Sequence, residues 1–290
     1  MRISLVYLAL FFSVLCMSFS SIMIKFCTAP AIIIALYRVF FTSGLAAFIR
    51  GPRLAGSLRS LSRRDLKLTM VSGFFLALHL GFWITSLSYT SVSSSVLFTN
   101  LQVIFVLVLS IVLLKEKPGR MAILGIFIAL AGSFCIAQGD LSRGRFLGDM
   151  LSLASGLFVG IYYLIGRQIR ARVDTMTYTA INCAVACLFL ALFCLATGQR
   201  FTGYPYLDWL LFLLMALGPG LAGHGLLNWA LKYLQAPTVS VSILGESVGA
   251  SILAYFIFGE NLLWYQISGG LLILTGIYIA AVNEGQGIAD

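Results

Sequence analysis

Charge is what this sequence has little of: of its 290 residues only 10% are Asp, Glu, Lys or Arg, while 60% are hydrophobic and the mean hydropathy is +1.00. An ordinary soluble domain carries about 25% charged residues. A soluble fold is therefore excluded, and so is a separate soluble catalytic domain. The 2 histidines and 6 cysteines show no metal-ligand spacing, and no glycine-rich phosphate loop with its lysine occurs. The sequence predicts no metal site, no cofactor and no use of ATP.

The sequence contains many long apolar runs. Runs of roughly 20 residues, each able to cross a ~30 Å hydrocarbon layer as a helix, recur along the whole chain. We predict ten spans, at residues 5–27, 31–50, 67–88, 93–114, 119–138, 147–169, 176–197, 206–233, 238–258 and 262–282. The expected fold is an all-α, multi-pass integral membrane protein in contact with the lipid bilayer. The first run is not interpreted as a cleaved signal peptide, because it is long and carries Lys25 near its end.

The basic residues set the predicted orientation, because positively charged loops stay on the cytoplasmic side. With the N-terminus inside, 14 of the 19 fall on that side: Arg2, Arg50, Arg53, Arg59, Arg63, Arg64, Lys67, Lys115, Lys117, Arg120, Arg167, Arg170, Arg172 and Lys232. Arg143, Arg145 and Arg200 fall outside, whereas Lys25 and Arg38 lie in helices near the outer face. Both termini are then cytoplasmic. The net charge of +9 reflects this topology, with some contact to anionic lipid, and predicts no nucleic-acid partner.

The chain also repeats itself, because Leu87–Ala137 aligns with Leu231–Ala281 at a constant offset of 144 residues. The offset makes these pairs: Tyr89 with Tyr233, Glu116 with Glu260, Gly125 with Gly269, Gly132 with Gly276, and Gln102 with Glu246. An odd number of predicted helices, five, separates the copies, so one copy is inverted relative to the other. We predict two inverted five-helix repeats, residues 1–142 and 143–290. Such repeats are typical of secondary transporters, whose halves rock about a central site.

With these features the chain resembles the drug/metabolite transporter superfamily, specifically its ten-helix EamA-type members. The resemblance is carried by Gly245-Glu246-Ser247-Val248 through Phe258-Gly259-Glu260, by Gly269 and Gly276, and by the first-half copy Asn100-Leu101-Gln102 through Lys115-Glu116-Lys117. It covers essentially the whole chain, and it implies a central cavity built by helices one, three, four, six, eight and nine. Members often have proline after the glutamate of helix nine. Here Ser247 and, in the first half, Val103 stand in that place, so a break made by proline is in question.

Polar side chains four residues apart share a helix face and mark candidate cavity walls. His79 and Trp83 have this spacing on helix three, and His224 and Asn228 have it on helix eight. The other candidates for substrate binding come from helices four, six and nine: Asn100, Gln102, Tyr162 and Glu246. Trp229 and Tyr163 are weaker candidates. Polar residues of this kind can instead bond helix to helix for packing alone, and each histidine can be a satisfied interior group.

Glu246 is the one acidic side chain set deep inside an apolar run. An unpaired carboxylate near the membrane midplane costs a few kcal/mol, which favours its neutral form. Three interpretations stay open: a proton carrier, a partner for a cationic group of the substrate, or a structural glutamate bonded to a neighbouring helix. Arg38 and Lys25 are the candidate charge partners, although both are expected toward the outer face. Arg38 could instead bind a substrate carboxylate or extend to the surface.

Two glycine patterns complete the set of candidates. Gly218, Pro219 and Gly220 form a candidate hinge in helix eight, with a kink that does not move as the alternative. The paired glycines of helices five and ten could pack these helices within one protomer or between two, so a homodimer stays open.

The sequence thus predicts a secondary-active transporter of a small organic metabolite that works by alternating access in the cell membrane. An amino acid or an amphipathic organic cation is favoured as substrate, export is favoured over uptake, and proton coupling is one option. The alternatives are an uptake carrier and an uncoupled facilitator, channel or scramblase. An intramembrane enzyme is disfavoured, because Glu246 has no second carboxylate, metal cluster or nucleophile beside it in the sequence.

Overall fold

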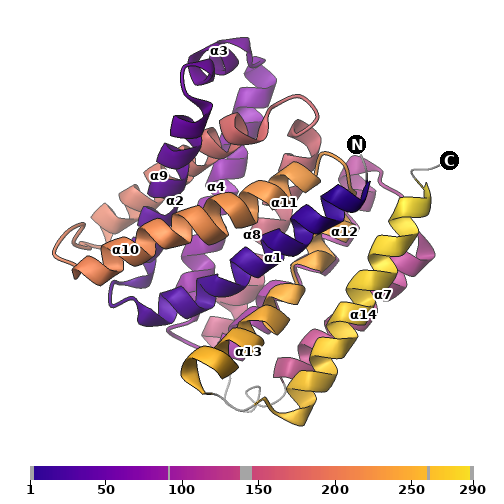
Figure 1. The fold of residues 1–290 in the computed structure, drawn as a ribbon. Coiled ribbons are helices and arrows are strands. Elements are labelled where there is room, and N and C mark those ends of the chain that lie inside the picture. Colours follow the sequence, from indigo (N-terminus) through magenta and orange to yellow (C-terminus); the bar gives the residue numbers. More distant parts are fainter. Residues whose placement is uncertain (1–2, 91, 138–145, 260–261, 288–290) are drawn as a thin grey trace.

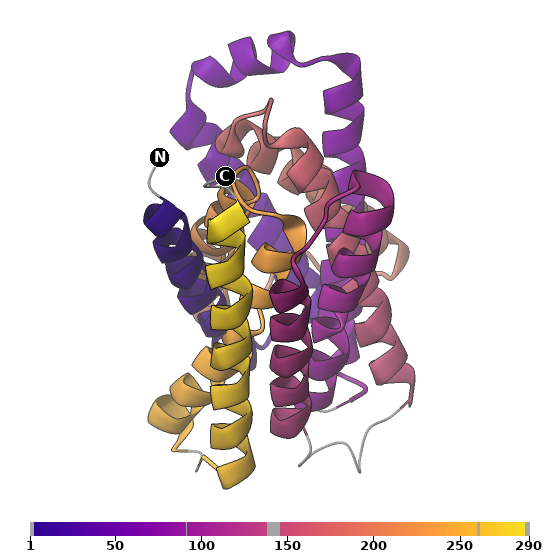
Figure 2. The same cartoon turned by 90° about the vertical axis from the view of Figure 1, so that its right-hand side faces the viewer.

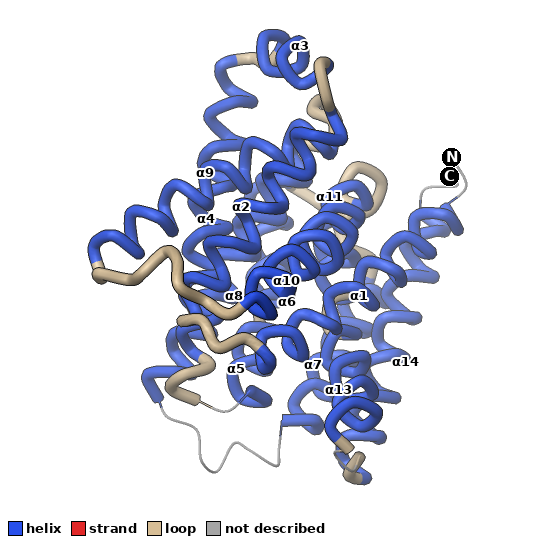
Figure 3. The backbone as a smooth tube through the Cα atoms, turned by 60° about the vertical axis from the view of Figure 1, so that its left-hand side comes forward, coloured by secondary structure: helices blue, strands red, loops and turns tan. Residues whose placement is uncertain are grey.

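The computed structural model describes residues 3–90, 92–137, 146–259 and 262–287, and these residues contain helices and loops but no strand (Figures 1 and 3). The helices are α1 (Ile3–Phe26), α2 (Ala31–Arg50), α3 (Arg53–Ser60), α4 (Arg63–Ser86), α5 (Val92–Asn100), α6 (Gln102–Leu109), η1 (Ser110–Leu114), α7 (Arg120–Ala137), α8 (Phe146–Ile169), α9 (Thr175–Ala196), α10 (Tyr206–Met215), η3 (Ala216–His224), α11 (Gly225–Ala230), α12 (Ala236–Ser242), α13 (Gly245–Phe258) and α14 (Trp264–Gly287). Within the described chain they make ten segments long and apolar enough to span a membrane. The predicted ten-span, all-α fold is confirmed.

The third span begins at Arg63 rather than at residue 67. Its start is fixed by Ser62, whose hydroxyl accepts a hydrogen bond from the Asp65 amide at 3.0 Å. Asp65 also lies in the first helical turn, where a negative charge is favourable. The stretch predicted as a plain connection contains the short helix α3, which has no buried residue. In Figures 1 and 2, α3 lies at the same end of the molecule as both chain termini. We call this end the termini side and the opposite end the far side.

Spans four and nine are both broken near their middle, although neither has a proline there. At the first break the Leu101 amide bonds to the Phe98 carbonyl at 3.3 Å, and at the second Ile243 bonds to Ser240 at 3.2 Å and Glu246 to Ile243 at 2.8 Å. These are bonds to the third preceding residue, which tighten the chain locally into a 3₁₀ turn. The breaks therefore arise from backbone tightening and place irregular backbone next to Gln102 and Glu246.

Helix α7 lies side by side with the longer α14 (Figures 1 and 2). A Cβ atom added to Gly125 would lie 2.5 Å from the Gly276 carbonyl oxygen, and one added to Gly132 would lie 2.5 Å from that of Gly269. Only glycine permits this backbone approach. At the 144-residue offset Gly125 corresponds to Gly269 and Gly132 to Gly276, so each contact corresponds to the other. The two contacts are therefore related by the two-fold symmetry of an inverted repeat. The paired glycines thus pack helices five and ten within one protomer, while the repeat boundary at residue 142 stays a prediction.

The candidate hinge lies in η3, a π-helical stretch with Pro219 inside it. An interior proline lacks the N–H that the α-helix needs, which accounts for the irregular geometry. Gly220 lies against Thr42 of α2, so closely that a Cβ atom would overlap the Thr42 hydroxyl. This glycine is required for packing, and movement at η3 stays a prediction.

Candidate substrate site

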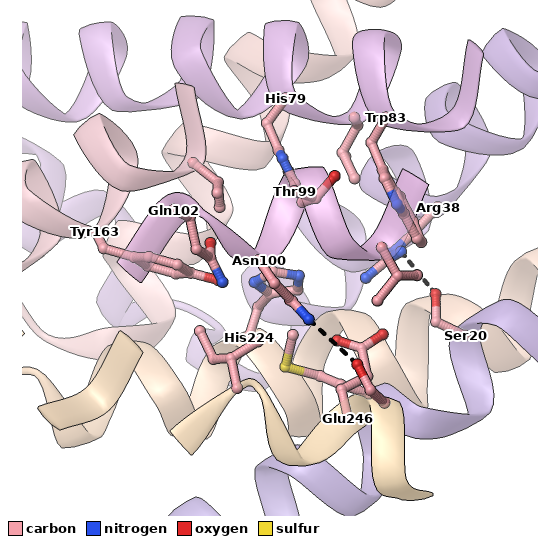
Figure 4. A pocket seen from close by; sticks show the side chains of 16 residues that line it. Ser20, Arg38, His79, Trp83, Thr99, Asn100, Gln102, Tyr163, His224 and Glu246 are labelled. Carbon is pink, nitrogen blue, oxygen red and sulfur yellow. Dashed lines mark hydrogen bonds between the residues drawn. The ribbon is translucent and has the colours of Figure 1, made fainter. Parts of the chain in front are cut away.

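A small central cavity of about 50 Å³ lies among α1, α2, α4, α8, η3, α13 and the broken span four. Its wall contains six of the residues predicted as binding candidates: His79, Trp83, Asn100, Gln102, His224 and Glu246. Figure 4 shows these side chains converging, with Tyr163 and Gln102 at one end of the cavity and Arg38, Ser20 and Trp83 at the other. The polar stripes of the sequence therefore meet around one space.

Helix α4 supplies an aromatic wall. His79 and Trp83, one helical turn apart, stack with their ring planes 5° from parallel and their centroids 6.3 Å apart. The Nδ1 atom of His79 lies 2.8 Å from the Ser155 hydroxyl of α8, and that hydroxyl donates a hydrogen bond to the His79 carbonyl at 3.1 Å. His79 is thus held as part of the packing and also faces the cavity. The flat pair suits an apolar or aromatic group of a ligand.

Asn100 joins three spans at the break in span four. Its amide nitrogen donates to the Ser133 hydroxyl at 3.1 Å and to the Ser247 hydroxyl at 3.2 Å. These bonds link span four to α7 and to α13, directly beside Glu246. Asn100 therefore has the helix-bonding role that the sequence left open, in addition to its place in the cavity wall.

Arg38 has the inward of the two orientations that the sequence left open. Its side chain turns into the protein, where the residue is only 4% exposed and lines the central cavity. Its Nη1 atom donates to the Ser20 hydroxyl at 3.0 Å (Figure 4). Arg38 and Glu246 attract each other electrostatically, yet among the described residues neither forms an ion pair. One cation and one anion thus face the same cavity without neutralising each other in direct contact.

Tyr162 and Asn228 do not reach the central cavity. They line a smaller cavity next to it, where the Asn228 amide donates to the Tyr162 hydroxyl at 2.5 Å. Arg38 and His224 face both spaces. The neighbour Tyr163, a weaker candidate from the sequence, lines the central cavity instead.

A second space of about 370 Å³, the far-side cavity, continues from the central one toward the far side. The two share Trp83, Val96, Glu246 and Ser247 in their walls. Lys25 lines this outer space and not the central cavity, and its ammonium group lies 5.0 Å from the centre of the Phe258 ring. Glu246 therefore stands between the central cavity and the route to the far side.

On the termini side, three ion pairs join residues before 137 to residues after 146 in the described chain. They join Arg50 to Asp174 at 3.4 Å, Glu116 to Arg167 at 2.8 Å, and Asp65 to Arg172 at 2.7 Å. The hydrogen bond to Asp65 raises the pKa of Arg172 above its ordinary value. For Asp174, partial burial alone would raise the pKa, but hydrogen bonds from Thr177 and the charges of Arg50 and Arg170 offset this and leave it lowered. Among the described residues, the ion pairs between the two halves thus lie on the termini side, and the larger cavity lies toward the far side.

Ten membrane-spanning helices around a polar central cavity define a multi-pass membrane transporter, and the comparisons with known proteins agree. The sequence profile described as "EamA-like transporter family" matches residues 4–138 and again residues 146–282. The chain belongs to this family.

Two relatives and one solved structure illustrate how far the similarity extends. An "Uncharacterized transporter" of Archaeoglobus fulgidus is 24% identical over 260 residues, 87% of this chain and 88% of that one. The "Uncharacterized transporter YyaM" of Bacillus subtilis is 24% identical over 67% of this chain and 66% of that one. A structure titled "Crystal structure of protein" covers 98% of both chains with a TM-score of 0.80 at 17% identity, which shows a shared fold alone.

Proposed function

We propose that this chain is a secondary-active carrier that moves a small zwitterionic metabolite, such as an amino acid, across the cell membrane by alternating access. The observation that carries the proposal is the unpaired Arg38 and Glu246 in the wall of one cavity. Buried charges are costly unless they are paired. A ligand with a carboxylate and an ammonium group pairs both at once.

The cavity also favours a zwitterion over the organic cation that the sequence left open. A cation would meet Glu246 but would be repelled by Arg38 in the same wall. The stacked His79 and Trp83 rings and Tyr163 provide apolar surface for the rest of the ligand. Export, and movement of a proton on Glu246 as the source of energy, belong to this proposal, because Glu246 stands where the central cavity meets the far-side cavity.

Three ligands that share one skeleton test the proposal: phenylalanine, phenethylamine, which lacks the carboxylate, and phenylpropionate, which lacks the ammonium group. We expect phenylalanine to bind the purified protein most tightly in a thermal-shift titration. A charge-assisted hydrogen bond contributes about 1.5–3 kcal/mol, so removing either ligand charge should weaken binding by roughly 10- to 150-fold. Counterflow of the same ligands in proteoliposomes then distinguishes a carrier from a channel, because only a carrier shows saturable exchange.

Matched variants test which charge of the ligand each residue binds. Arg38→Gln should remove the advantage of phenylalanine over phenethylamine, and Glu246→Gln should remove its advantage over phenylpropionate. Lys25→Gln, in the outer cavity, is the control and should leave both preferences unchanged. Equal losses for all three ligands in each variant would show that Arg38 and Glu246 support the fold and do not bind substrate.

A further inference from the structure

We call the far-side cavity the open route. The 144-residue repeat relates its lining residues to a filled region on the termini side. Three residues of span nine in the far-side cavity correspond, at the offset of 144, to three residues of α6: Ser247 to Val103, Ala250 to Val106, and Ser251 to Leu107. Leu97, also in the far-side cavity, corresponds to Val241 of α12. In transporters with inverted repeats, each half can adopt the conformation of the other. When the far-side route closes, the corresponding region on the termini side is then expected to open.

That counterpart region is filled in this structure. Val103 and Val241 are 0% exposed, and they belong with Leu107 and Ala280 to one apolar cluster that is separate from the main core. We call these four residues the termini-side plug. On α6 the plug has the branched residues Val103 and Leu107 where the open route has Ser247 and Ser251. On the other side Val241 and Ala280 correspond to Leu97 and Ile136 of the open route, so the difference in side-chain size lies on α6. A compact apolar plug excludes water and ions, which fits a closed gate rather than a gap left in the packing.

Glu116 holds the two sides of the plug together. It follows the end of span four, and its Oε1 atom accepts a hydrogen bond from Arg167 of α8 at 2.8 Å. Its Oε2 atom accepts one from the Ala236 amide, the first residue of α12, at 3.2 Å. Arg167 also donates to the Leu231 carbonyl, just before α12, at 2.9 Å. The chain segment that carries Leu107 is thus tied to the one that carries Val241.

We infer that the substrate passes between α6 and α12 on its way to the termini side, through the termini-side plug, and that release of Glu116 opens this passage. The inference rests on the proposed transport function, because it names the second half of the substrate's route. It assigns Glu116 a role in the equilibrium between two conformations and none in substrate binding.

Cysteine accessibility tests the passage without any substrate. Full-length protein in nanodiscs is treated with N-ethylmaleimide, and labelling rates are read peptide by peptide in a mass spectrometer, so the 6 native cysteines stay in place. Val241→Cys reports the plug, with Leu107→Cys as a second reporter should the first variant not fold. Ser251→Cys reports the open route, and Ala46→Cys, fully buried on α2, reports general loosening.

We expect Ser251→Cys to react quickly and Val241→Cys hardly at all when Glu116 is present. Adding Glu116→Gln should raise the Val241→Cys rate by about tenfold, the effect of a conformational shift of about 1.4 kcal/mol, and should lower the Ser251→Cys rate. Lys117→Gln, an exposed neighbour, is the charge control and should change neither rate. Opposite changes at the two reporters support the passage whatever the substrate proves to be.

Two results would overturn the inference. If Glu116→Gln protects Ser251→Cys but leaves Val241→Cys and Leu107→Cys unreactive, the route to the termini side lies elsewhere. If all reporters including Ala46→Cys speed up together, the substitution merely loosens the helices. Counterflow measured on the same samples separates these outcomes from a failure of the transport proposal, because accessibility can alternate in a protein that moves none of the tested ligands.

Discussion

Alanine at the glycine contacts between α7 and α14 should destabilise the protein, and the structure gives the magnitude. A Cβ atom at Gly132 would lie 2.5 Å from the Gly269 carbonyl oxygen and 2.8 Å from the Ile273 nitrogen, both of them backbone atoms. Ordinary contact begins at 3.4 Å, so the helices would have to separate by about 0.9 Å. Overpacking of this kind typically costs about 1–3 kcal/mol, and backbone atoms cannot move aside as a flexible side chain can.

The symmetry of the contact sharpens the expectation. Gly125 contacts Gly276 in the same way that its repeat counterpart Gly269 contacts Gly132. Gly125→Ala and Gly269→Ala should therefore lower the free energy of unfolding by the same amount, within about 0.5 kcal/mol. Gly44, inside α2, is the matched control, because nothing lies within 4 Å of a Cβ atom built there. Gly44→Ala should instead stabilise by about 0.5–1 kcal/mol, since alanine favours the helix.

Thermal unfolding in detergent, followed by tryptophan fluorescence, measures these changes. For a chain of this size class a change of 1 kcal/mol moves the apparent Tm by about 2–4 °C, so Gly132→Ala should lower it by roughly 2–12 °C. Size-exclusion chromatography of each variant confirms that the oligomeric state is unchanged. A Gly132→Ala protein with a Tm equal to or above that of the unsubstituted chain, like Gly44→Ala, would refute the packing of α7 on α14.

Three further predictions concern single polar residues. Glu246→Gln should abolish the dependence of transport on a pH gradient while leaving counterflow measurable, which paired assays in proteoliposomes check. Asn100→Ala removes the bonds from span four to α7 and α13 and should cost about 0.6–2 kcal/mol, read as a lowered apparent Tm. Asp174→Ala removes the cap of α9 and should cost about 0.5–2 kcal/mol at pH 7. Because the pKa of Asp174 is lowered in the folded protein, this stabilisation is full above the unfolded-state pKa and is lost as the pH falls through the folded-state value, so unfolding curves of the two proteins should converge in acid.

The sequence predicted the spans and most of the central cavity because both depend on local patterns. Apolar runs set the spans, and the four-residue spacing placed His79 and Trp83 on one face, where the structure has them. The orientation of the Arg38 side chain stayed open, because a basic residue near a helix end can extend to the surface or turn inward. A signal was present: Ala35, Thr42 and Ala46 continue a stripe of small residues through Arg38, and all of them are buried. Such a stripe marks the face that packs against other helices.

Adjacent residues on α8 show where sequence reasoning stops. Tyr162 and Tyr163 are both about 1% exposed, but Tyr163 lines the central cavity and Tyr162 bonds to Asn228 in the smaller one. Neighbours on a helix point about 100° apart, so their roles depend on the rotation of α8 about its axis. That rotation is set by contacts such as Gly156 against the Thr99 carbonyl. The partner of Gly156 could not be identified from the sequence alone.

The scaffold is symmetric but the cavity is not, and this difference gives a last test of the substrate site. Gln102 is the repeat counterpart of Glu246, and both line the central cavity. Gln102 lies at the Tyr163 end, however, whereas Glu246 lies nearer to Arg38 (Figure 4). The double variant Gln102→Glu with Glu246→Gln keeps the charge of the cavity and moves the carboxylate away from Arg38.

If the spacing of the two charges selects the ligand, the double variant should bind phenylalanine as weakly as Glu246→Gln alone. It should instead gain affinity for a longer ω-amino acid, such as 6-aminohexanoate, whose charges lie further apart. Thermal-shift titrations with both ligands measure this, and Gln102→Glu alone is the control for the added charge. Recovery of phenylalanine binding in the double variant would mean that only the net charge of the cavity matters, and the pairing of Arg38 and Glu246 with one ligand would have to be abandoned.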